Sequence, residues 1–402
     1  MSPDVPTTPF DNLDLRDLSW RDGEKWSGVG DGVLASWVAD MDFATAPPVR
    51  EALLRRSGGD LGYPSWFDQS GGGPLGDVFA ARMLRRFGIA LDAAHVRMFT
   101  DLNQAMLATL HVATKPGDAV VLHTPACPPF ISVIGRIGRR PLTVPLQPTD
   151  SGWEFDPDRI ERTVTDQGLG RCRVLFLVNP HNPTGRVFRR DELETLAELA
   201  LRHDLLVISD EVHADLTHAP HQHIPFASLG EEIASRTVTL TSGSKAFNLA
   251  GVRCAVAHVG PESVREAFDE LSGLMFGQVG VLGVEALKAA WTDGDVWLDD
   301  VLAVLDRNRR RLADRLPAGI RYRMPEGTFL AWLDCRELGL GADPVPFFRD
   351  EAKVLLFSGT AFGANGDGFV RLNFATSAPV LDEKLDRMAT ALSRPHPSLY
   401  GA

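Results

Sequence analysis

The sequence contains few cysteines and no long apolar run. Its 402 residues include four cysteines, Cys127, Cys172, Cys254 and Cys335, and no two of them form a C-x-x-C pair. This spacing offers no disulfide framework and favours a reducing, cytoplasmic setting. No stretch of roughly 18 or more apolar residues is present, so no membrane-spanning helix is expected.

The sequence is also short of positive charge and of any secretory signal. Lys and Arg number 41 against 53 Asp and Glu, which gives a formal net charge of −12. We therefore expect no non-specific binding to nucleic acid or to an anionic membrane surface. The N-terminal residues MSPDVPTTPFDNLDLRD lack the basic start and the apolar run of a signal peptide.

Short apolar runs alternate with amphipathic stretches through the middle of the chain. The runs are AVVLH (119–123), VLFLV (174–178), LLVIS (205–209), TVTLT (237–241) and AVAHV (255–259). Each is short enough to be a buried strand, and RRDELETLAELALRH between two of them repeats apolar residues at three and four. The alternation predicts an α/β fold: a three-layer structure with a mostly parallel sheet and helices on both faces.

Three regions are expected along the chain. Residues 1–47 are rich in Asp, Pro, Gly and Trp and predict an irregular N-terminal arm that joins the small domain. Residues 48–285 contain the strand–helix alternation and predict the large domain. Residues 286–402 hold long helical stretches, the strand-like GTFLAWLD and FVRLNFA, and a terminal helix. They predict a smaller α+β domain whose sheet also draws on the arm.

Polar side chains follow three of the predicted strands, where ligands bind in sheets of this kind. They are Asn182 in NPHNPTG after VLFLV, Asp210 and His213 in DEVHADL after LLVIS, and Ser242, Ser244 and Lys245 in SGSK after TVTLT. Taken singly, each stretch has an ordinary explanation: a tight turn, a helix cap beside a surface histidine, and a solvated lysine.

Taken together, the three strand ends predict one ligand. Asn182 offers an amide, Asp210 a carboxylate and Lys245 an amine flanked by hydroxyls. This set fits a ligand with a phenolic oxygen, a basic ring nitrogen, an aldehyde and a phosphate, and pyridoxal 5′-phosphate has all four. A lysine condenses with the aldehyde, and a carboxylate keeps the ring nitrogen protonated. The protonated ring then accepts electrons from a carbanion at the substrate α-carbon, and Arg253 can donate two N–H groups to the phosphate.

Several motifs resemble those of a known family. NPHNPTG, SDEVHADL, SGSKAFNLAG and RLNFA resemble the motifs of the fold-type I pyridoxal-phosphate enzymes, the aspartate aminotransferase superfamily, and the resemblance covers nearly the whole chain. Within that superfamily, SWVADMDFATAPPV and DEVHADL resemble the cystathionine β-lyases and related carbon–sulfur lyases of the MalY/PatB type. Members of this branch are also described as aminotransferases.

The resemblance implies a role for each matched residue. Lys245 binds the cofactor and moves protons, Asn182 contacts the phenolic oxygen and Asp210 pairs with the pyridinium. His213 stands where the aminotransferases have a tyrosine, and Arg371 in RLNFA clamps the substrate α-carboxylate rather than making a surface ion pair. The implied phosphate contacts are Ser242, Ser244, Arg253, the cup at Asp101 and Leu102, and Tyr63, which reaches the phosphate of the partner subunit in a homodimer.

The chain departs from the family pattern at two positions. The phosphate cup usually carries small residues, whereas this chain has Asp101, an acid that would repel phosphate. We expect Asp101 to contribute its backbone N–H, or to cap a helix with its side chain turned away. Cys127 fills a position that usually holds a tyrosine on the cofactor face. It fits a small buried hydrophobe, a reactive thiol, or a pocket where Phe130 or Trp66 replaces the ring; our hypothesis is a wider pocket with an inert thiol.

The function expected from these residues is that of a pyridoxal-phosphate-dependent carbon–sulfur β-lyase. Such an enzyme cleaves an L-cysteine thioether to thiol, pyruvate and ammonia. The alternative is an aminotransferase of class I/II, which needs the same contacts to substrate and cofactor. A weakly catalytic cofactor-binding protein that acts through partners is a distant third interpretation. No metal site is expected.

Overall fold

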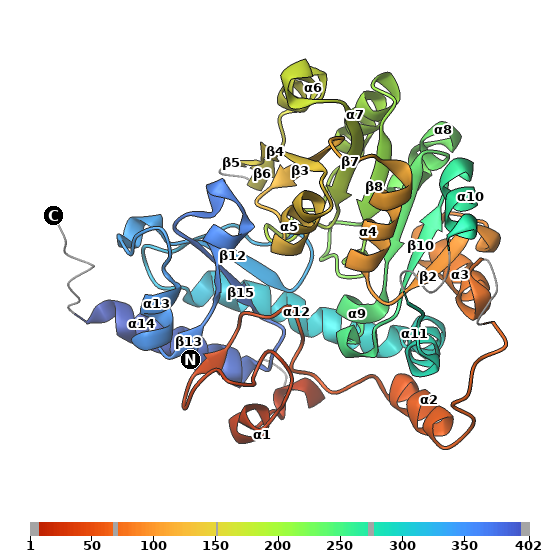
Figure 1. The fold of residues 1–402 in the computed structure, drawn as a ribbon. Helices are drawn as coiled ribbons and strands as arrows, with labels where there is room; N and C mark the ends of the chain where they lie inside the picture. The colour runs from red at the N-terminus through yellow and green to blue at the C-terminus, as the bar shows by residue number, and fades with distance from the viewer. Residues whose placement is uncertain (1–7, 67–70, 150–151, 272–276, 395–402) are drawn as a thin grey trace.

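A seven-stranded sheet organises the larger part of the chain (Figure 1). The computed structural model describes residues 8–66, 71–149, 152–271 and 277–394. In spatial order the strands are β2 (Val96–Phe99), β10 (Ala255–Val259), β9 (Thr237–Thr241), β8 (Leu206–Asp210), β7 (Cys172–Val178), β3 (Ala119–Thr124) and β4 (Arg140–Pro145). Neighbours from β9 to β4 are parallel, and β10 is antiparallel to both of its neighbours. The predicted mostly parallel sheet and the five predicted strands are confirmed.

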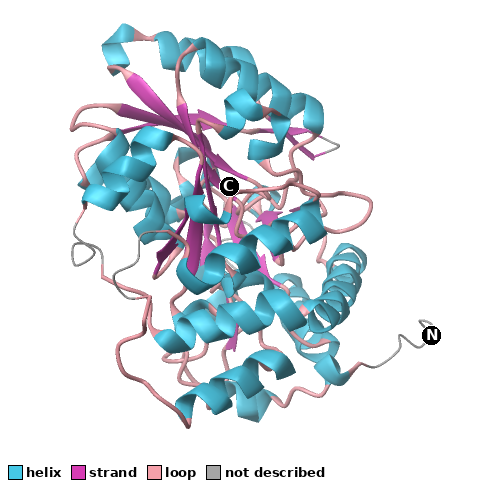
Figure 2. Cartoon of the chain, turned by 90° about the vertical axis from the view of Figure 1, so that its right-hand side faces the viewer, coloured by secondary structure: helices cyan, strands magenta, loops and turns pink. Residues whose placement is uncertain are grey.

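Helices cover both faces of this sheet, as Figure 2 shows. One layer contains α4 (Leu102–Ala113), α5 (Pro128–Arg136) and α10 (Glu262–Glu270), and the other contains α6 (Pro157–Thr165), α7 (Arg190–Arg202) and α8 (Glu231–Ala234). Successive side chains of a strand point to opposite faces. On β7, Val174 and Phe176 therefore pack into the first layer, whereas Leu175 and Leu177 pack into the second.

A smaller four-stranded sheet lies beside the first. Its strands in spatial order are β11 (Arg321–Tyr322), β12 (Leu330–Asp334), β15 (Phe369–Asn373) and β14 (Phe357–Ser358). The helices of this region are α12 (Asp295–Arg315), α13 (Val345–Asp350) and α14 (Ala378–Ser393). Two further helices, α2 (Pro47–Ser57) and α11 (Val281–Asp293), pack against each other, and α3 (Gly76–Phe87) packs on α11. A short hairpin, β5 (Gln147–Thr149) and β6 (Gly152–Glu154), follows β4.

The N-terminal arm holds little regular structure but is firmly attached. It contains α1 (Leu15–Ser19) and β1 (Leu34–Ala35), and β1 pairs in parallel with β13 (Val354–Leu355). The arm thus forms a separate two-stranded sheet with the small region instead of extending the four-stranded sheet. One hydrophobic cluster runs from Met41 of the arm through Leu287 to Leu372. The boundaries at residues 47 and 285 stay a prediction, because this shared core crosses both.

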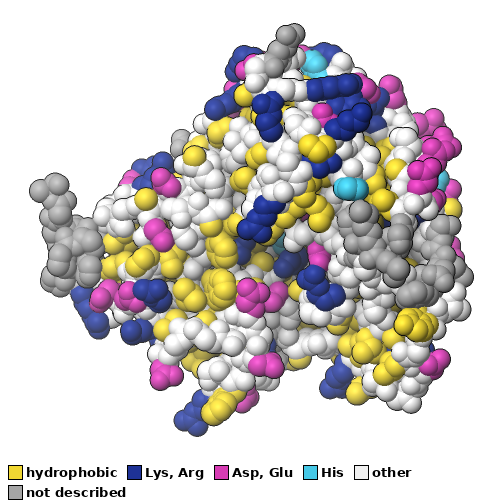
Figure 3. Space-filling view, in the orientation of Figure 1, with side chains coloured by type: hydrophobic (Ala, Val, Ile, Leu, Met, Phe, Trp, Pro, Cys, Tyr) yellow, Lys and Arg dark blue, Asp and Glu magenta, His cyan; other side chains and the backbone are white. Residues whose placement is uncertain are grey.

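The surface carries charges of both signs. On the face drawn in Figure 3, Lys and Arg side chains gather at the top of the view, and Asp and Glu side chains gather along the right edge and the lower left. No helix among the described residues is both long and apolar enough to cross a membrane.

The packing of α11 against the residues that precede β10 can be tested at Gly283. A Cβ at this position would lie 2.6 Å from the carbonyl oxygen of Val252 and 3.1 Å from Cβ of Cys254. Since a backbone carbonyl cannot move aside freely, Gly283→Ala should destabilise the protein by about 1–3 kcal/mol, measured as a lower melting temperature. Gly135→Ala, at an exposed position inside α5 where an added Cβ meets nothing within 4 Å, is the matched control and should not lower stability. Equal melting temperatures for the two variants would contradict the packing described here.

Candidate active site

Three neighbouring parallel strands end at the same edge of the large sheet and deliver the predicted side chains there. The register pairs Val178 at the end of β7 with Asp210 at the end of β8, and Asp210 with Leu240 near the end of β9. The Asn179 N–H donates to the Asp210 carbonyl oxygen at 3.0 Å, which ties the Asn182 loop to β8. Lys245 follows β9 on the short helix α9 (Gly243–Ala246). The sheet therefore brings Asn182, Asp210 and Lys245 to one edge.

Lys245 is held by the N-terminal arm. Its Nζ donates to the carbonyl oxygen of Ala39 at 2.8 Å and lies 3.9 Å from Oδ1 of Asp40. Burial lowers the pKa of the amine, and the Asp40 carboxylate opposes that shift. A lowered pKa increases the neutral fraction of an amine, which is the form that attacks a carbonyl and accepts protons.

Asp210 is a carboxyl group held out of water. It is 3% exposed, and its Oδ1 accepts from the Val212 N–H at 3.1 Å. Burial raises its pKa to about 7, whereas the Val212 N–H and the Lys245 charge act in the opposite direction. A cation placed against this carboxylate would compensate the cost of its burial.

His213 and Arg371 complete the wall around the lysine. His213 is buried, and its pKa falls to about 3 because of burial first and then the nearby charges of Lys245 and Arg371. Its imidazole is therefore neutral near pH 7. Burial also lowers the pKa of Arg371 to about 10, so its guanidinium stays charged.

The guanidinium of Arg371 is fixed on several sides. Nη1 donates to Oδ1 of Asn182 at 3.1 Å, and Nη2 donates to the carbonyl oxygen of Trp37 at 2.8 Å. The rings of Phe357 and Phe362 lie 4.9 and 5.1 Å from the guanidinium carbon, at cation–π distance. Within the described residues, Nε of Arg371 and Nδ1 of His213 have no hydrogen-bond partner. The two hydrogen bonds use two of the five N–H groups of this buried guanidinium, and the donors that remain fit an arginine that receives a carboxylate.

Cys127 also belongs to this group of residues. It precedes α5, is half-buried, and interacts electrostatically with Arg371, Lys245 and Asp210. Burial raises the pKa of its thiol, and the two cations only partly offset that effect. The thiol is therefore protonated near pH 7, which supports the hypothesis of an inert cysteine; the wider pocket stays a prediction.

The predicted phosphate contacts lie farther along the same edge. Because β10 runs antiparallel to its neighbours, its first residues stand beside the last residues of β2 and β9: Ala255 pairs with Phe99, and Val256 with Thr241. Arg253, two residues before β10 begins, therefore meets Asp101, two residues after β2 ends. Nη2 of Arg253 forms an ion pair with Oδ2 of Asp101.

Asp101 departs in part from what the sequence led us to expect. It does cap α4, since its Oδ1 accepts from the Gln104 N–H at 2.9 Å. However, its side chain is not turned away, because Oδ2 faces Arg253. Leu102 is the first residue of α4, so its N–H lies at the helix N-terminus.

The other predicted phosphate contacts differ in their hydrogen bonds and in their exposure. Ser242 donates its hydroxyl proton to the Cys254 carbonyl oxygen at 2.7 Å and accepts from the Ser244 N–H at 3.0 Å, so it caps α9. Ser244 lies next to Lys245 and is half-buried. Tyr63 is 87% exposed in the single chain, and its predicted phosphate contact stays a prediction.

Sequence reasoning missed the residues that hold the arm against the lysine. Nδ2 of Asn373 donates at 2.6 Å to the carbonyl oxygens of both Val38 and Asp40. The amide of Asn248 donates to Met41 O at 3.0 Å and accepts from Met41 N at 2.9 Å. The asparagine of RLNFA and the asparagine three residues after Lys245 were visible in the sequence, but nothing there showed that both reach the arm.

The side chains at this edge fit pyridoxal 5′-phosphate. A buried carboxyl with a raised pKa suits a ring cation, a half-buried amine with a lowered pKa suits the aldehyde, and the start of α4 next to Arg253 suits a phosphate. The negative charge of Asp101 is the one feature of this set that opposes the phosphate. Among the described residues, no cluster of His, Cys, Asp or Glu could hold a metal ion.

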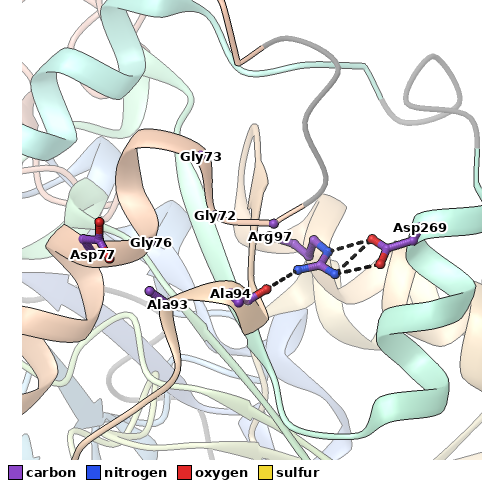
Figure 4. A pocket seen from close by; sticks show the side chains of 9 residues that line it. Gly72, Gly73, Gly76, Asp77, Ala93, Ala94, Arg97 and Asp269 are labelled. Atoms are coloured by element: carbon purple, nitrogen blue, oxygen red, sulfur yellow. Dashed lines mark hydrogen bonds and ion pairs between the residues drawn. The ribbon is translucent and has the colours of Figure 1, made fainter.

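A separate surface hollow of about 460 Å³ lies away from this edge, beside the glycines that precede α3 (Figure 4). Arg97 faces it but is paired with Asp269, through contacts of 2.9 to 3.2 Å. Asp77 is the other charged residue of its lining, and the described lining residues include no lysine or histidine, so this hollow does not offer the chemistry considered above.

Comparison with known proteins agrees with this geometry. Residues 40–392 match the family model for aminotransferase class I and II. The cystathionine beta-lyase PatB of Bacillus subtilis is 32% identical, over 95% of this chain and 98% of that protein.

Two solved structures also resemble the chain over its whole length. The crystal structure of OvoB has a TM-score of 0.88 and 37% identity, covering 97% of this chain and 100% of that one. The pyridoxal-phosphate-bound C–S lyase of Staphylococcus hominis has a TM-score of 0.87 and 28% identity, covering 96% and 99%. The architecture of the fold-type I enzymes, which the sequence predicted, is therefore confirmed.

Asp40 should set the protonation of Lys245. Removing its negative charge removes the influence that opposes burial, so Asp40→Asn should lower the pKa of Lys245 further. The pH at which Lys245 begins to react with a small amine-directed reagent, followed by peptide mass spectrometry, should then fall. Exposed Lys288 provides an internal reference, and Asp31→Asn, an exposed aspartate of the same arm, is the matched control. An unchanged or higher midpoint for Lys245 would show that Asp40 does not act on it.

Proposed function

The chain belongs to the aminotransferase class I and II family, and on that premise we propose that it is a pyridoxal-phosphate-dependent carbon–sulfur β-lyase. It cleaves an L-cysteine thioether, with cystathionine as the type substrate, to a thiol, pyruvate and ammonia. The observation that carries the proposal is the half-buried amine of Lys245, whose pKa is lowered and which lies at one sheet edge with Asp210, Asn182 and Arg371. The full-length similarity to a cystathionine β-lyase and a C–S lyase favours elimination as the reaction.

Each residue at this edge is assigned to a different part of the cofactor. Asp210 would pair with the ring nitrogen, Asn182 would donate to the phenolic oxygen, and Lys245 would hold the aldehyde carbon. The N–H groups at the start of α4, the Ser244 hydroxyl and Arg253 would hold the phosphate. When bound, pyridoxal 5′-phosphate supplies a ring that accepts electrons from the substrate α-carbon.

Lys245 carries the proton transfers. With substrate bound, Nζ of Lys245 would be a half-buried amine with a lowered pKa, and it would accept the proton from the substrate α-carbon. The resulting ammonium has the Ala39 carbonyl oxygen at 2.8 Å and the Asp40 carboxylate at 3.9 Å. Both stabilise the charge until the proton passes to the departing sulfur.

Arg371 and His213 orient the substrate without adding a second base. The guanidinium of Arg371 receives the α-carboxylate, since its position is fixed by Asn182 O, Trp37 O and two aromatic rings. His213 is neutral because its pKa is lowered to about 3. It therefore contributes a polar contact near the phenolic oxygen and no charge.

An aminotransferase is the second candidate, and the family match favours it specifically because the matching model is that of aminotransferases. The two reactions share the same proton removal by Lys245 and differ in where the proton is returned. In an aminotransferase, Lys245 would return the proton away from the substrate α-carbon, and turnover would require a keto acid as amino-group acceptor. In elimination, the sulfur leaves and pyruvate forms without any keto-acid acceptor.

We place the enzyme in the cytoplasm as a homodimer. The four cysteines are free in the structure, which suits a reducing compartment. Tyr63 is 87% exposed and lies on the segment that follows α2. A twofold dimer, the commonest form of soluble oligomer, would bring this phenol to the phosphate of the other subunit.

The reaction can be tested on the purified protein with cystathionine. We expect pyruvate and free thiol in equal amounts in the absence of any keto acid, measured by lactate dehydrogenase coupling and a thiol reagent. Because Lys245 is the proposed base, Lys245→Ala should lower the rate by at least about 10²–10⁴-fold, whereas Lys288→Ala on the exposed face of α11 should not. Consumption of the amino acid only when a keto acid is added would favour the aminotransferase instead.

The shared site can be tested by mixing two inactive subunits. Tyr63→Phe weakens phosphate binding in the opposite subunit, and Lys245→Ala removes the base in its own. Random mixing of the two variants should restore about one quarter of the sites, because half of the dimers then carry one intact site. Restored turnover on mixing supports the dimer, and its absence, with both variants folded and dimeric by light scattering, would place Tyr63 in its own subunit or outside the site.

A further inference from the structure

The ion pair between Asp101 and Arg253 stands in the place assigned to the cofactor phosphate. Of the predicted phosphate contacts in this chain, Arg253 supplies the only positive charge and Asp101 supplies an equal negative one. The remaining contacts, Leu102, Ser242 and Ser244, are neutral. The set therefore has no net charge with which to attract a phosphate dianion.

Asp101 is locked in this position by its second role. Its Oδ1 accepts from the Gln104 N–H at 2.9 Å as the cap of α4. With Oδ1 used by the cap, Oδ2 faces Arg253 and also accepts from the Thr100 hydroxyl at 3.4 Å. The carboxylate also occupies the positive end of a 12-residue helix, where an anion is favoured.

Other donors near the phosphate position are already used. The Ser242 hydroxyl proton goes to the Cys254 carbonyl oxygen at 2.7 Å. The Thr100 N–H goes to Oε1 of Gln104 at 2.7 Å. The phosphate is thus left with fewer neutral donors, and its hold depends more strongly on Arg253.

We propose that Asp101 is an internal competitor of the cofactor phosphate for Arg253, so that this protein binds pyridoxal 5′-phosphate weakly and exchanges it readily. The inference rests on the proposed function. The phosphate reaches Arg253 only by displacing Asp101 or by lying beside its negative charge. Both routes reduce the affinity contributed by the phosphate and leave the contacts to the ring unchanged.

The test compares the cofactor with its phosphate-free analogue. The full-length protein is dialysed to equilibrium against a series of concentrations of pyridoxal 5′-phosphate or pyridoxal, and bound ligand is measured by absorbance. Asp101→Asn and Asp101→Ser remove the charge but retain a side chain that caps helices. Both should lower the Kd for pyridoxal 5′-phosphate by about tenfold or more, equivalent to about 1.4 kcal/mol, and leave the Kd for pyridoxal unchanged.

A matched control and a second variant complete the test. Asp156 caps α6 in the same way, with its side chain accepting from the Arg159 N–H at 2.9 Å; Asp156→Asn should change neither Kd. Arg253→Gln should weaken binding of the phosphorylated cofactor more in the Asp101→Asn background than in the wild type, because Arg253 is then free of its competitor.

Three results would overturn the proposal. An unchanged or higher Kd for pyridoxal 5′-phosphate in both Asp101 variants would show that the aspartate orients Arg253 instead of competing for it. Equal changes for both ligands would show that Asp101 acts through the fold or the ring. Failure of the wild type and every variant to bind either ligand would overturn the proposed function together with this inference.

Discussion

One constraint connects the two parts of the site: the half-buried amine of Lys245 is held beside groups that accept its hydrogen bond or balance its charge. The large sheet places the amine, but the nearest acceptor, the Ala39 carbonyl oxygen at 2.8 Å, comes from the arm. A segment without regular structure must be held at several points to offer a fixed acceptor, because free chain would lose conformational entropy on binding. Asn248 and Asn373 supply these points through their amides.

Three aspartates at this edge have different surroundings and so serve different purposes. Asp210 is buried and has a pKa raised to about 7. Asp40 is 35% exposed and acts on the lysine across 3.9 Å, where solvent screens part of its effect. Asp101 caps a helix and pairs with Arg253. Burial and partners, rather than residue type, separate these roles.

The direction of one strand decides the composition of the phosphate region. In a fully parallel sheet, a residue that precedes a strand would lie at the opposite edge from residues that follow strands. Arg253 precedes β10, yet it lies beside Asp101 and Ser242 because β10 runs antiparallel to both β2 and β9. The same reversal places the Cys254 carbonyl oxygen where it accepts a hydrogen bond from the Ser242 hydroxyl. The direction of β10 therefore brings the positive charge of Arg253 to this edge and also engages the Ser242 hydroxyl.

The sequence by itself determined the five central strands, their alternation with helices, and the arrival of Asn182, Asp210 and Lys245 at one edge. These follow from local patterns, since apolar runs and the residues after them lie within a few positions of each other. Only the tertiary structure decided that Asp40 meets Lys245, that the arm pairs with β13, and that Asp101 faces Arg253. Lys245 and Ala39 are 206 positions apart, and Arg253 and Asp101 are 152. Contacts over such separations depend on how whole layers pack and on the direction of each strand, and a local sequence pattern records neither.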